Sequence, residues 1–141
     1  QLSNLLCFIH SQMPPLVHRD IKPDNILLDM NSHRIVVTDF GLAERQRNGA
    51  SSGKRMGTHF YMSPEACAGS AANTQSDMWS AGCVLYVLCT RKATADRGAR
   101  YLFRDIRNQP DFHDEIAHEL HELDYSDDLI NLCVRLLQLS P

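Results

Sequence analysis

The stretch that most constrains the fold of this chain is residues 17–41, which reads VHRDIKPDNILLDMNSHRIVVTDFG. It contains two short apolar runs, residues 26–28 and 35–37, with the turn-prone pair Asn31 and Ser32 between them. Apolar runs of that length, separated by a turn, predict two short strands that pair as a hairpin.

Polar side chains flank the predicted hairpin at the ends that it would bring together. Asp20, Lys22 and Asn25 precede the first strand, and Asp39 follows the second. We therefore expect these four side chains to face one point in space. Two carboxylates, an ammonium group and an amide suit the binding of a metal-bound phosphate.

Helical periodicity dominates the rest of the chain. Residues 76–90 are apolar on most sides of a helix, so we expect this helix in the middle of a domain, capped by Asn73 or Thr74. The polar residues 42–55 are rich in Gly and Ser and predict a surface loop. Other helices are expected at residues 2–9, 101–106 and 116–123 and after Ser126. The predicted fold class is mainly α with one small β-hairpin.

The composition excludes several classes of protein. A chain of 141 residues is long enough for one domain with a core, and its net charge of −3 gives no support for nucleic acid or membrane surfaces as partners. No apolar run could span a bilayer, and the start does not read as a signal peptide. The five scattered cysteines form no C-x-x-C pair, which indicates reduced thiols in a cytoplasmic or nuclear protein.

The two ends of the sequence predict that it is a piece of a longer protein. Gln1 lies inside an amphipathic pattern, there is no initiator Met, and the chain stops at Pro141 just after a predicted helix. We therefore expect further sequence on both sides.

Four motifs in order resemble the eukaryotic serine/threonine protein kinases. Residues 18–25 (HRDIKPDN) resemble the catalytic loop H-R-D-x-K-x-x-N, and residues 39–41 are Asp-Phe-Gly. Residues 63–65 (Ser-Pro-Glu) stand for the usual A-P-E, and residues 77–82 match D-x-W-x-x-G. The resemblance implies a protein-kinase-like fold and places residues 1–141 in the large, C-terminal lobe only. That span runs from the helix before the catalytic loop to the penultimate helix, so the N-terminal lobe and the last helix are absent.

The resemblance assigns the chemistry to four side chains and implies ATP and Mg²⁺ as cofactors. Asp20 orients the substrate hydroxyl and accepts its proton, and Lys22 binds and neutralises the transferring phosphoryl group. Asn25 and Asp39 hold Mg²⁺ through oxygen ligands.

Other residues receive supporting roles by the same resemblance. Asp24 and Leu27 belong to the nucleotide site, with Leu27 as the floor under the adenine ring. Thr58 bonds Asp20 and Lys22, and Asp77 accepts hydrogen bonds from the catalytic-loop backbone. The remaining structural positions of the family's motifs are His18, Phe40, Gly41 and Glu65.

The residue types also indicate a class of protein substrate. Lys22 followed by Pro23, and Thr58 ahead of Tyr61, match serine/threonine kinases, and Leu42 goes with Ser rather than Thr as the acceptor. The wording of residues 61–65 (YMSPE) resembles the NIMA-related group.

Regulation has two open interpretations. Arg19 beside the catalytic Asp is typical of kinases that an upstream kinase activates by phosphorylation, because the loop phosphate pairs with that Arg. The usual acceptor position is Lys54 here, although Ser51 and Ser52 lie nearby. Alternatively, this kinase needs no loop phosphorylation, and the two serines are ordinary loop residues.

The missing elements make two rival functions worth testing. Without the N-terminal lobe half of the ATP site is absent, so we expect the 141-residue piece alone to be inactive, and Glu65 to lack its Arg partner. A pseudokinase scaffold that only binds other proteins is the first rival, and a small-molecule phosphotransferase is the second. The intact Asp20, Lys22, Asn25 and Asp39 argue against the first, and the Ser-Pro-Glu element argues against the second.

Overall fold

A computed structural model describes residues 1–46, 59–90 and 111–138 of the chain. The strands of the described part are β1 (Leu16–Val17), β2 (Ile26–Asp29), β3 (Arg34–Val37) and β4 (Glu44–Arg45). Two single 3-10 turns occur, η1 (Pro23–Asn25) and η2 (Phe40–Leu42). The helices are α1 (Leu2–His10), α2 (Pro64–Cys67), α3 (Thr74–Thr90), α5 (Phe112–Glu122) and α6 (Asp127–Leu136). The predicted fold class, mainly α with a small hairpin, is confirmed.

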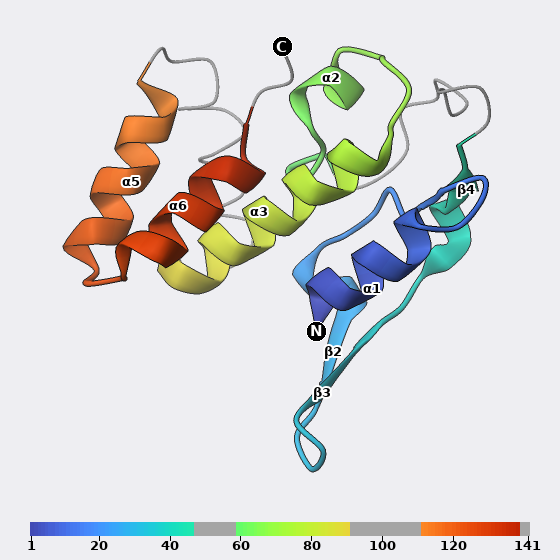
Figure 1. Ribbon diagram of the computed structural model, residues 1–141, viewed down its shortest axis with the longest axis horizontal. Coiled ribbons are helices and arrows are strands. Elements are labelled where there is room, and N and C mark those ends of the chain that lie inside the picture. Colours follow the sequence, from blue (N-terminus) through green and yellow to red (C-terminus); the bar gives the residue numbers. More distant parts are fainter. Residues whose placement is uncertain (47–58, 91–110, 139–141) are drawn as a thin grey trace.

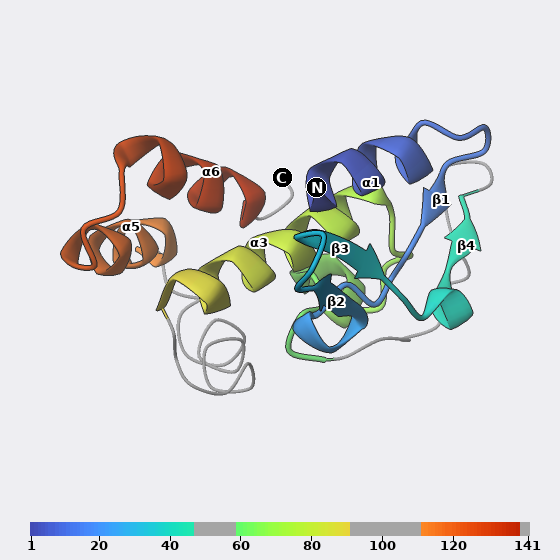
Figure 2. The ribbon, with the colours of Figure 1, turned by 90° about the horizontal axis from the view of Figure 1, so that it is seen from below.

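The helix α3 lies at the centre, as its apolar sequence predicts. It contacts α1, α5, α6 and β1, and it runs between the α1 end and the α5–α6 end of the molecule (Figures 1 and 2). A reciprocal cap starts it, because the Asn73 side chain accepts the Ser76 N–H at 3.0 Å and the Ser76 hydroxyl accepts the Asn73 N–H at 3.2 Å. Two side chains thus satisfy two backbone donors at the helix start.

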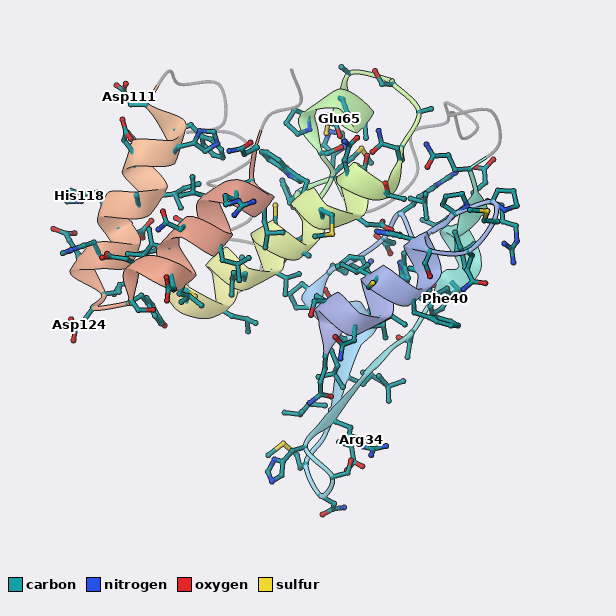
Figure 3. All side chains as sticks on the ribbon, viewed as in Figure 1. Arg34, Phe40, Glu65, Asp111, His118 and Asp124 are labelled. Atoms are coloured by element: carbon teal, nitrogen blue, oxygen red, sulfur yellow. The ribbon has the colours of Figure 1, made fainter. Side chains whose placement is uncertain are left out.

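The predicted hairpin forms with the expected strands. β2 and β3 pair antiparallel, with Ile26 opposite Val37 and Asp29 opposite Arg34. Figure 3 shows Arg34 near the end of the hairpin that projects away from the helices. The other end of the hairpin adjoins the polar loop of residues 18–25, so the register decides which polar side chains come together.

A second pair of strands was not predicted. β1 pairs antiparallel with β4, with Leu16 opposite Arg45 and Val17 opposite Glu44. The assignment of residues 42–55 to a loop is therefore wrong at its start; residues 47–55 lie outside the described residues. Two-residue strands so far apart in the chain have no local hydrophobic period, so only their tertiary pairing reveals them.

The C-terminal helices pack on α3 through apolar side chains. The rings of Trp79 on α3 and Phe112 on α5 stack with centroids 6.0 Å apart. Gly82 lets α6 approach closely, since a Cβ atom there would lie 2.9 Å from side-chain atoms of Leu136 and Leu137. The helix predicted after Ser126 is present, although the Ser126 side chain makes no capping hydrogen bond. The helix predicted at residues 101–106 lies outside the described residues.

The cysteines are free thiols, four of them buried and Cys7 exposed. Burial, together with the neighbouring Cys89, raises the pKa of Cys133 to about 12. Over the described ranges, the structure contains no helix with the length and apolarity needed to cross a membrane.

Candidate active site

The loop between β1 and β2 carries a cluster of polar side chains around Asp20. The Lys22 ammonium nitrogen lies 2.9 Å from the Asp20 carboxylate oxygen Oδ2. The Asn25 amide donates to the same oxygen at 3.0 Å and to the Asp20 carbonyl at 2.8 Å. Asp20 is buried, and this ammonium and amide stabilise its charge. The structure thus brings together three of the four residues that the sequence placed at one point.

These contacts orient the Asn25 side chain. The two Asp20 atoms in contact, the carbonyl oxygen and the carboxylate oxygen Oδ2, can only accept a hydrogen bond. The NH₂ group of Asn25 must therefore face Asp20. Its carbonyl oxygen Oδ1 then points away from Asp20. An amide oxygen in that position is a hard ligand of the kind that Mg²⁺ prefers.

The fourth residue, Asp39, follows β3 directly. The Thr38 N–H donates to the Asn25 carbonyl at 2.9 Å, so Asp39 lies one residue beyond a backbone contact with Asn25. Asp39 has a left-handed backbone (φ 60°), and its carboxylate accepts the Gly41 N–H at 3.3 Å. A Cβ atom at position 41 would lie 3.1 Å from that carboxylate, so glycine suits the tight turn.

Asp39 is exposed, and its carboxylate and the Asn25 amide supply hard oxygen ligands on adjacent segments. The described residues contain no group of three or more His, Cys, Asp or Glu side chains able to hold a metal ion. A set of two oxygen ligands fits Mg²⁺, which keeps several waters and phosphate oxygens in its shell.

His18 connects the two halves of the site. Its Nε2 atom lies 3.2 Å from the Thr38 carbonyl, which can only accept, so Nε2 carries the hydrogen. Its Nδ1 atom accepts the Asp20 N–H at 3.3 Å. The ring of Phe40 meets the His18 ring edge-on, with centroids 4.6 Å apart. His18 and Phe40 therefore pack together, and the His18 ring links the backbone of Asp20 to that of Thr38.

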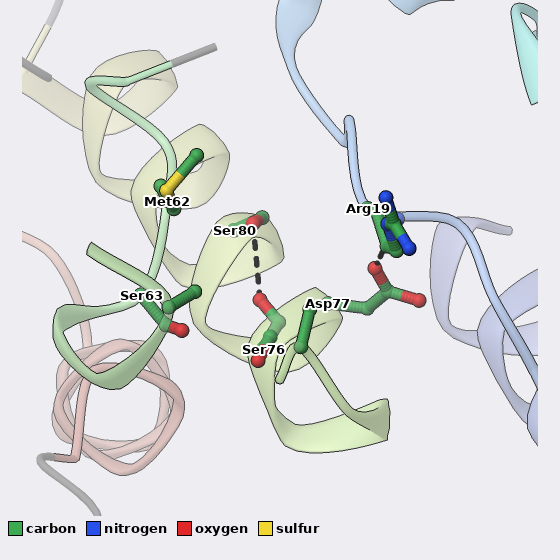
Figure 4. Close-up of a pocket in the computed structure, with 8 residues that line it drawn as sticks. Arg19, Met62, Ser63, Ser76, Asp77 and Ser80 are labelled. Atoms are coloured by element: carbon green, nitrogen blue, oxygen red, sulfur yellow. Dashed lines mark hydrogen bonds between the residues drawn. The ribbon is translucent and has the colours of Figure 1, made fainter. Parts of the chain in front are cut away.

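Asp77 ties the polar loop to the central helix. Its carboxylate is fully buried and accepts the backbone N–H groups of His18 and Arg19 at 2.8 and 2.9 Å. The contact with Arg19 is drawn in Figure 4. His10 on α1 adds a third contact at 2.8 Å, which the sequence analysis missed because this pair is far apart in the chain.

Arg19 makes an ion pair that the sequence analysis also missed. Its guanidinium pairs with the Glu44 carboxylate on β4. The only sequence signal for Glu44 is a single carboxylate in a polar stretch, which by itself does not indicate a partner. The strand pairing that brings it to Arg19 is a tertiary feature.

Glu65 does not stand alone in this structure. It is half-buried on α2, and the Ser76 hydroxyl lies 3.3 Å from its Oε1 atom. The sequence predicted that Glu65 lacks an Arg partner, and it did not predict this contact with a hydroxyl. The donor is the hydroxyl of Ser76 on α3.

The other predicted site residues are exposed or lie outside the described part. Leu27 is 54% exposed on β2, and Asp24 is exposed on η1 next to Asn25. The residues Thr58, Ser51 and Ser52 lie outside the described residues.

Comparisons with known proteins identify the family of the chain. The family described as "Protein kinase domain" matches residues 1–141. The chain therefore belongs to the protein kinase domain family, whose members generally use ATP and Mg²⁺.

Similar curated proteins point to one group of that family. G2-specific protein kinase nimA of Emericella nidulans is 33% identical over 132 residues, which cover 89% of this chain and 17% of that protein. Serine/threonine-protein kinase Nek5 of Homo sapiens is 42% identical over 65% of this chain and 13% of that protein. Serine/threonine-protein kinase nekl-2 of Caenorhabditis elegans is 39% identical over 60% of this chain and 24% of that protein. The resemblance to NIMA-related serine/threonine kinases is confirmed, and the chain spans at most about a quarter of the length of these relatives.

Proposed function

We propose that the protein containing this chain is a serine/threonine protein kinase that transfers the γ-phosphate of ATP to hydroxyl groups of a protein substrate. The observation that carries the proposal is the convergence of Lys22 and Asn25 on one oxygen of the buried Asp20 carboxylate. Phosphoryl transfer needs positioning and charge neutralisation more than covalent chemistry, and this cluster offers both. Residues 1–141 would form the C-terminal lobe of the kinase domain.

In this mechanism Asp20 accepts a hydrogen bond from the substrate hydroxyl and takes its proton as the bond to phosphorus forms. Its contacts to Lys22 and Asn25 hold the carboxylate in one orientation. Lys22 also places a positive charge where the phosphoryl oxygens become more negative. By resemblance to the family, Thr58 would bond Asp20 and Lys22.

Asn25 and Asp39 would hold Mg²⁺, which when bound neutralises phosphate charge and orients the triphosphate. Asp24 and Leu27 would lie at the nucleotide, with the exposed Leu27 side chain against the adenine ring. The apolar side chains exposed on the hairpin support a covering partner above it, and the N-terminal lobe would supply the rest of the ATP site.

The substrate class and cellular setting follow from finer features. Leu42 after the Asp-Phe-Gly motif favours Ser over Thr as the acceptor. The free thiols support a reducing compartment, so we place the protein in the cytoplasm or nucleus. A phosphate that an upstream kinase placed on Ser51 or Ser52 would have to pair with Arg19, which already has a carboxylate partner.

The test is transfer of phosphate by the full-length protein. We expect γ-phosphate transfer from ATP to a serine peptide mixture with Mg²⁺, and loss of about 10²–10⁴-fold in kcat in Asp20→Asn, because the base and the anchor for Lys22 are removed. Asp128→Asn on the exposed start of α6 is the matched control and should keep wild-type activity. The isolated 141-residue piece should show no transfer.

A pseudokinase scaffold is the second candidate. It is favoured only if folded wild-type protein transfers no phosphate, with or without an upstream kinase, and still binds partner proteins. Equal activity of wild type and Asp20→Asn would refute the proposed role of Asp20.

A further inference from the structure

The ion pair between Arg19 and Glu44 has an almost fully buried cation. The Arg19 side chain is 4% exposed, and its guanidinium pairs with Glu44, which is 33% exposed. An arginine does not lose its charge in a protein, so a buried guanidinium needs an anion beside it. In the described part of the chain, Glu44 supplies that anion.

The fold places Glu44 at this position through backbone pairing. Val17 on β1 lies opposite Glu44 on β4. Val17 is two residues before Arg19 in the chain. The Gln46 N–H donates to the Pro15 carbonyl at 2.8 Å and extends the same ladder. Glu44 on β4 is thus paired with β1, the strand that leads directly into the polar loop.

Arg19 is held at its backbone as well as at its side chain. Its φ of 70° lies in the left-handed region, which is unfavourable for a residue other than glycine. Its N–H donates to the buried Asp77 carboxylate at 2.9 Å, and Figure 4 shows Arg19 beside Asp77. Such a conformation persists only when its surroundings fix it at several points. The ion pair with Glu44 is one of these points. Asp20 directly follows Arg19 in the chain, so the same contacts hold its backbone in place.

We propose that Glu44 is a positioning residue, whose carboxylate supplies the anion beside Arg19 and holds the loop around Asp20 in place without phosphorylation of Ser51 or Ser52. The inference rests on the proposed kinase function. Of the two modes of regulation that the sequence left open, it favours the one that needs no loop phosphorylation.

Charge argues against a second anion at the same place. A phosphate carries a charge of about −1.5 to −2 at pH 7 and would meet the negative Glu44 carboxylate beside the single guanidinium of Arg19. Like charges at such short range repel, so phosphorylation of the segment would compete with Glu44 for Arg19.

The activity test uses the full-length protein after phosphatase treatment, with its phosphate content checked by mass spectrometry. We expect the dephosphorylated wild type to keep its activity within about twofold. Glu44→Gln should lower kcat by about ten- to a hundredfold with KM for ATP nearly unchanged, because a misplaced catalytic group costs rate rather than binding. Glu44→Asp, which keeps the charge, should recover part of the loss. Glu122→Gln on the exposed face of α5 is the matched control.

A second test measures the ion pair without using activity. Urea unfolding of wild type, Arg19→Gln, Glu44→Gln and the double variant forms a double-mutant cycle. We expect the two substitutions to be non-additive, with a coupling of roughly tenfold in the unfolding equilibrium constant. Additive effects would overturn the ion pair as a structural support.

The outcomes separate this inference from the proposed function. If wild type transfers no phosphate, the kinase function fails and the positioning role fails with it. If wild type is active but depends on loop phosphate, or if Glu44→Gln matches wild type, only the role of Glu44 is overturned. Coupled unfolding with an unchanged kcat would likewise overturn the positioning role.

Discussion

At the scale of single residues, the buried polar groups decide how the site is held. Asp77 is fully buried, yet each of its contacts goes to a hydrogen-bond donor or an imidazole ring. Ser63 is 1% exposed, and its hydroxyl has no hydrogen-bond partner within the described residues. A buried polar group with partners stabilises a protein, and one without partners costs stability.

The first residue-scale prediction concerns Asp77. Asp77→Asn should lower the free energy of unfolding by about 3 kcal/mol, because the amide NH₂ group would face a backbone N–H donor. Urea denaturation of the folded domain measures this loss. Asp128→Asn, at an exposed position on α6, should change it by less than about 0.5 kcal/mol. An Asp77→Asn protein as stable as wild type would contradict the role of this carboxylate.

The second prediction concerns Ser63. Ser63→Ala should leave the free energy of unfolding unchanged or raise it by up to about 1 kcal/mol, because it removes a buried hydroxyl that has no partner among residues 1–46, 59–90 and 111–138. The matched control is Ser76→Ala. Ser76 lines the same cavity of about 20 Å³ as Ser63, but its hydroxyl contacts Asn73 and Glu65. That substitution should cost about 1–2 kcal/mol. Thermal unfolding compares the pair, and equal losses would show that Ser63 has a partner after all.

At the scale of elements, the tip of the β2–β3 hairpin is organised by one carboxylate. Asp29 accepts hydrogen bonds from the Ser32 hydroxyl at 2.5 Å and the Asn31 N–H at 2.9 Å. The hydrogen bond from the Ser32 side chain, and then that from Asn31, hold the pKa of Asp29 below its ordinary value of 3.8. These bonds favour the ionised carboxylate and so fix the turn at neutral pH.

The hairpin prediction is a pH dependence. Since the pKa of Asp29 is lower in the folded state, its stabilisation is present above pH 3.8 and is lost as the pH falls through the depressed pKa. Ser32→Ala should raise the pKa of Asp29 towards 3.8. An NMR titration of the Asp29 carboxyl carbon measures both values. Ser126→Ala, at an exposed serine far from the turn, should leave the Asp29 titration unchanged.

At the scale of the whole molecule, α3 joins two groups of elements. One group contains α1 and the strands beside the polar loop, and the other contains α5 and α6 (Figure 2). The loop side is tied to α3 by Asp77, and the other side packs on it through the stacked rings of Trp79 and Phe112. A defect at either joint should therefore weaken the whole fold rather than one element.

The whole-molecule prediction tests the aromatic joint. Phe112 is 2% exposed, so Phe112→Ala should lower the free energy of unfolding by about 3–5 kcal/mol. Trp79 is the single tryptophan of the chain, and its fluorescence reports the transition directly. Phe8→Ala, at a phenylalanine that is 65% exposed on α1, should cost less than about 1 kcal/mol. Similar losses for the two variants would mean that the stacking carries little stability.

The sequence by itself determined the features that depend on neighbouring residues. Helical spacing predicted α1, α3 and α6, and a turn between apolar runs predicted β2 and β3. The hairpin in turn predicted that Asp39 would come close to Asn25, because the ends of paired strands adjoin. The contacts of Asp20 with Lys22 and Asn25 form within the loop of residues 18–25. The four motifs were enough to indicate the family.

Only the tertiary structure decided which distant residues meet. The pairing of β1 with β4, the contact of His10 with Asp77 and the ion pair of Arg19 with Glu44 each join segments that have no shared local pattern. Local periodicity predicts which face of an element is buried, but a buried charge or backbone donor is satisfied by whatever group packing brings within hydrogen-bond distance. The residue that stabilises Arg19, Glu44, could therefore be identified only from the tertiary structure.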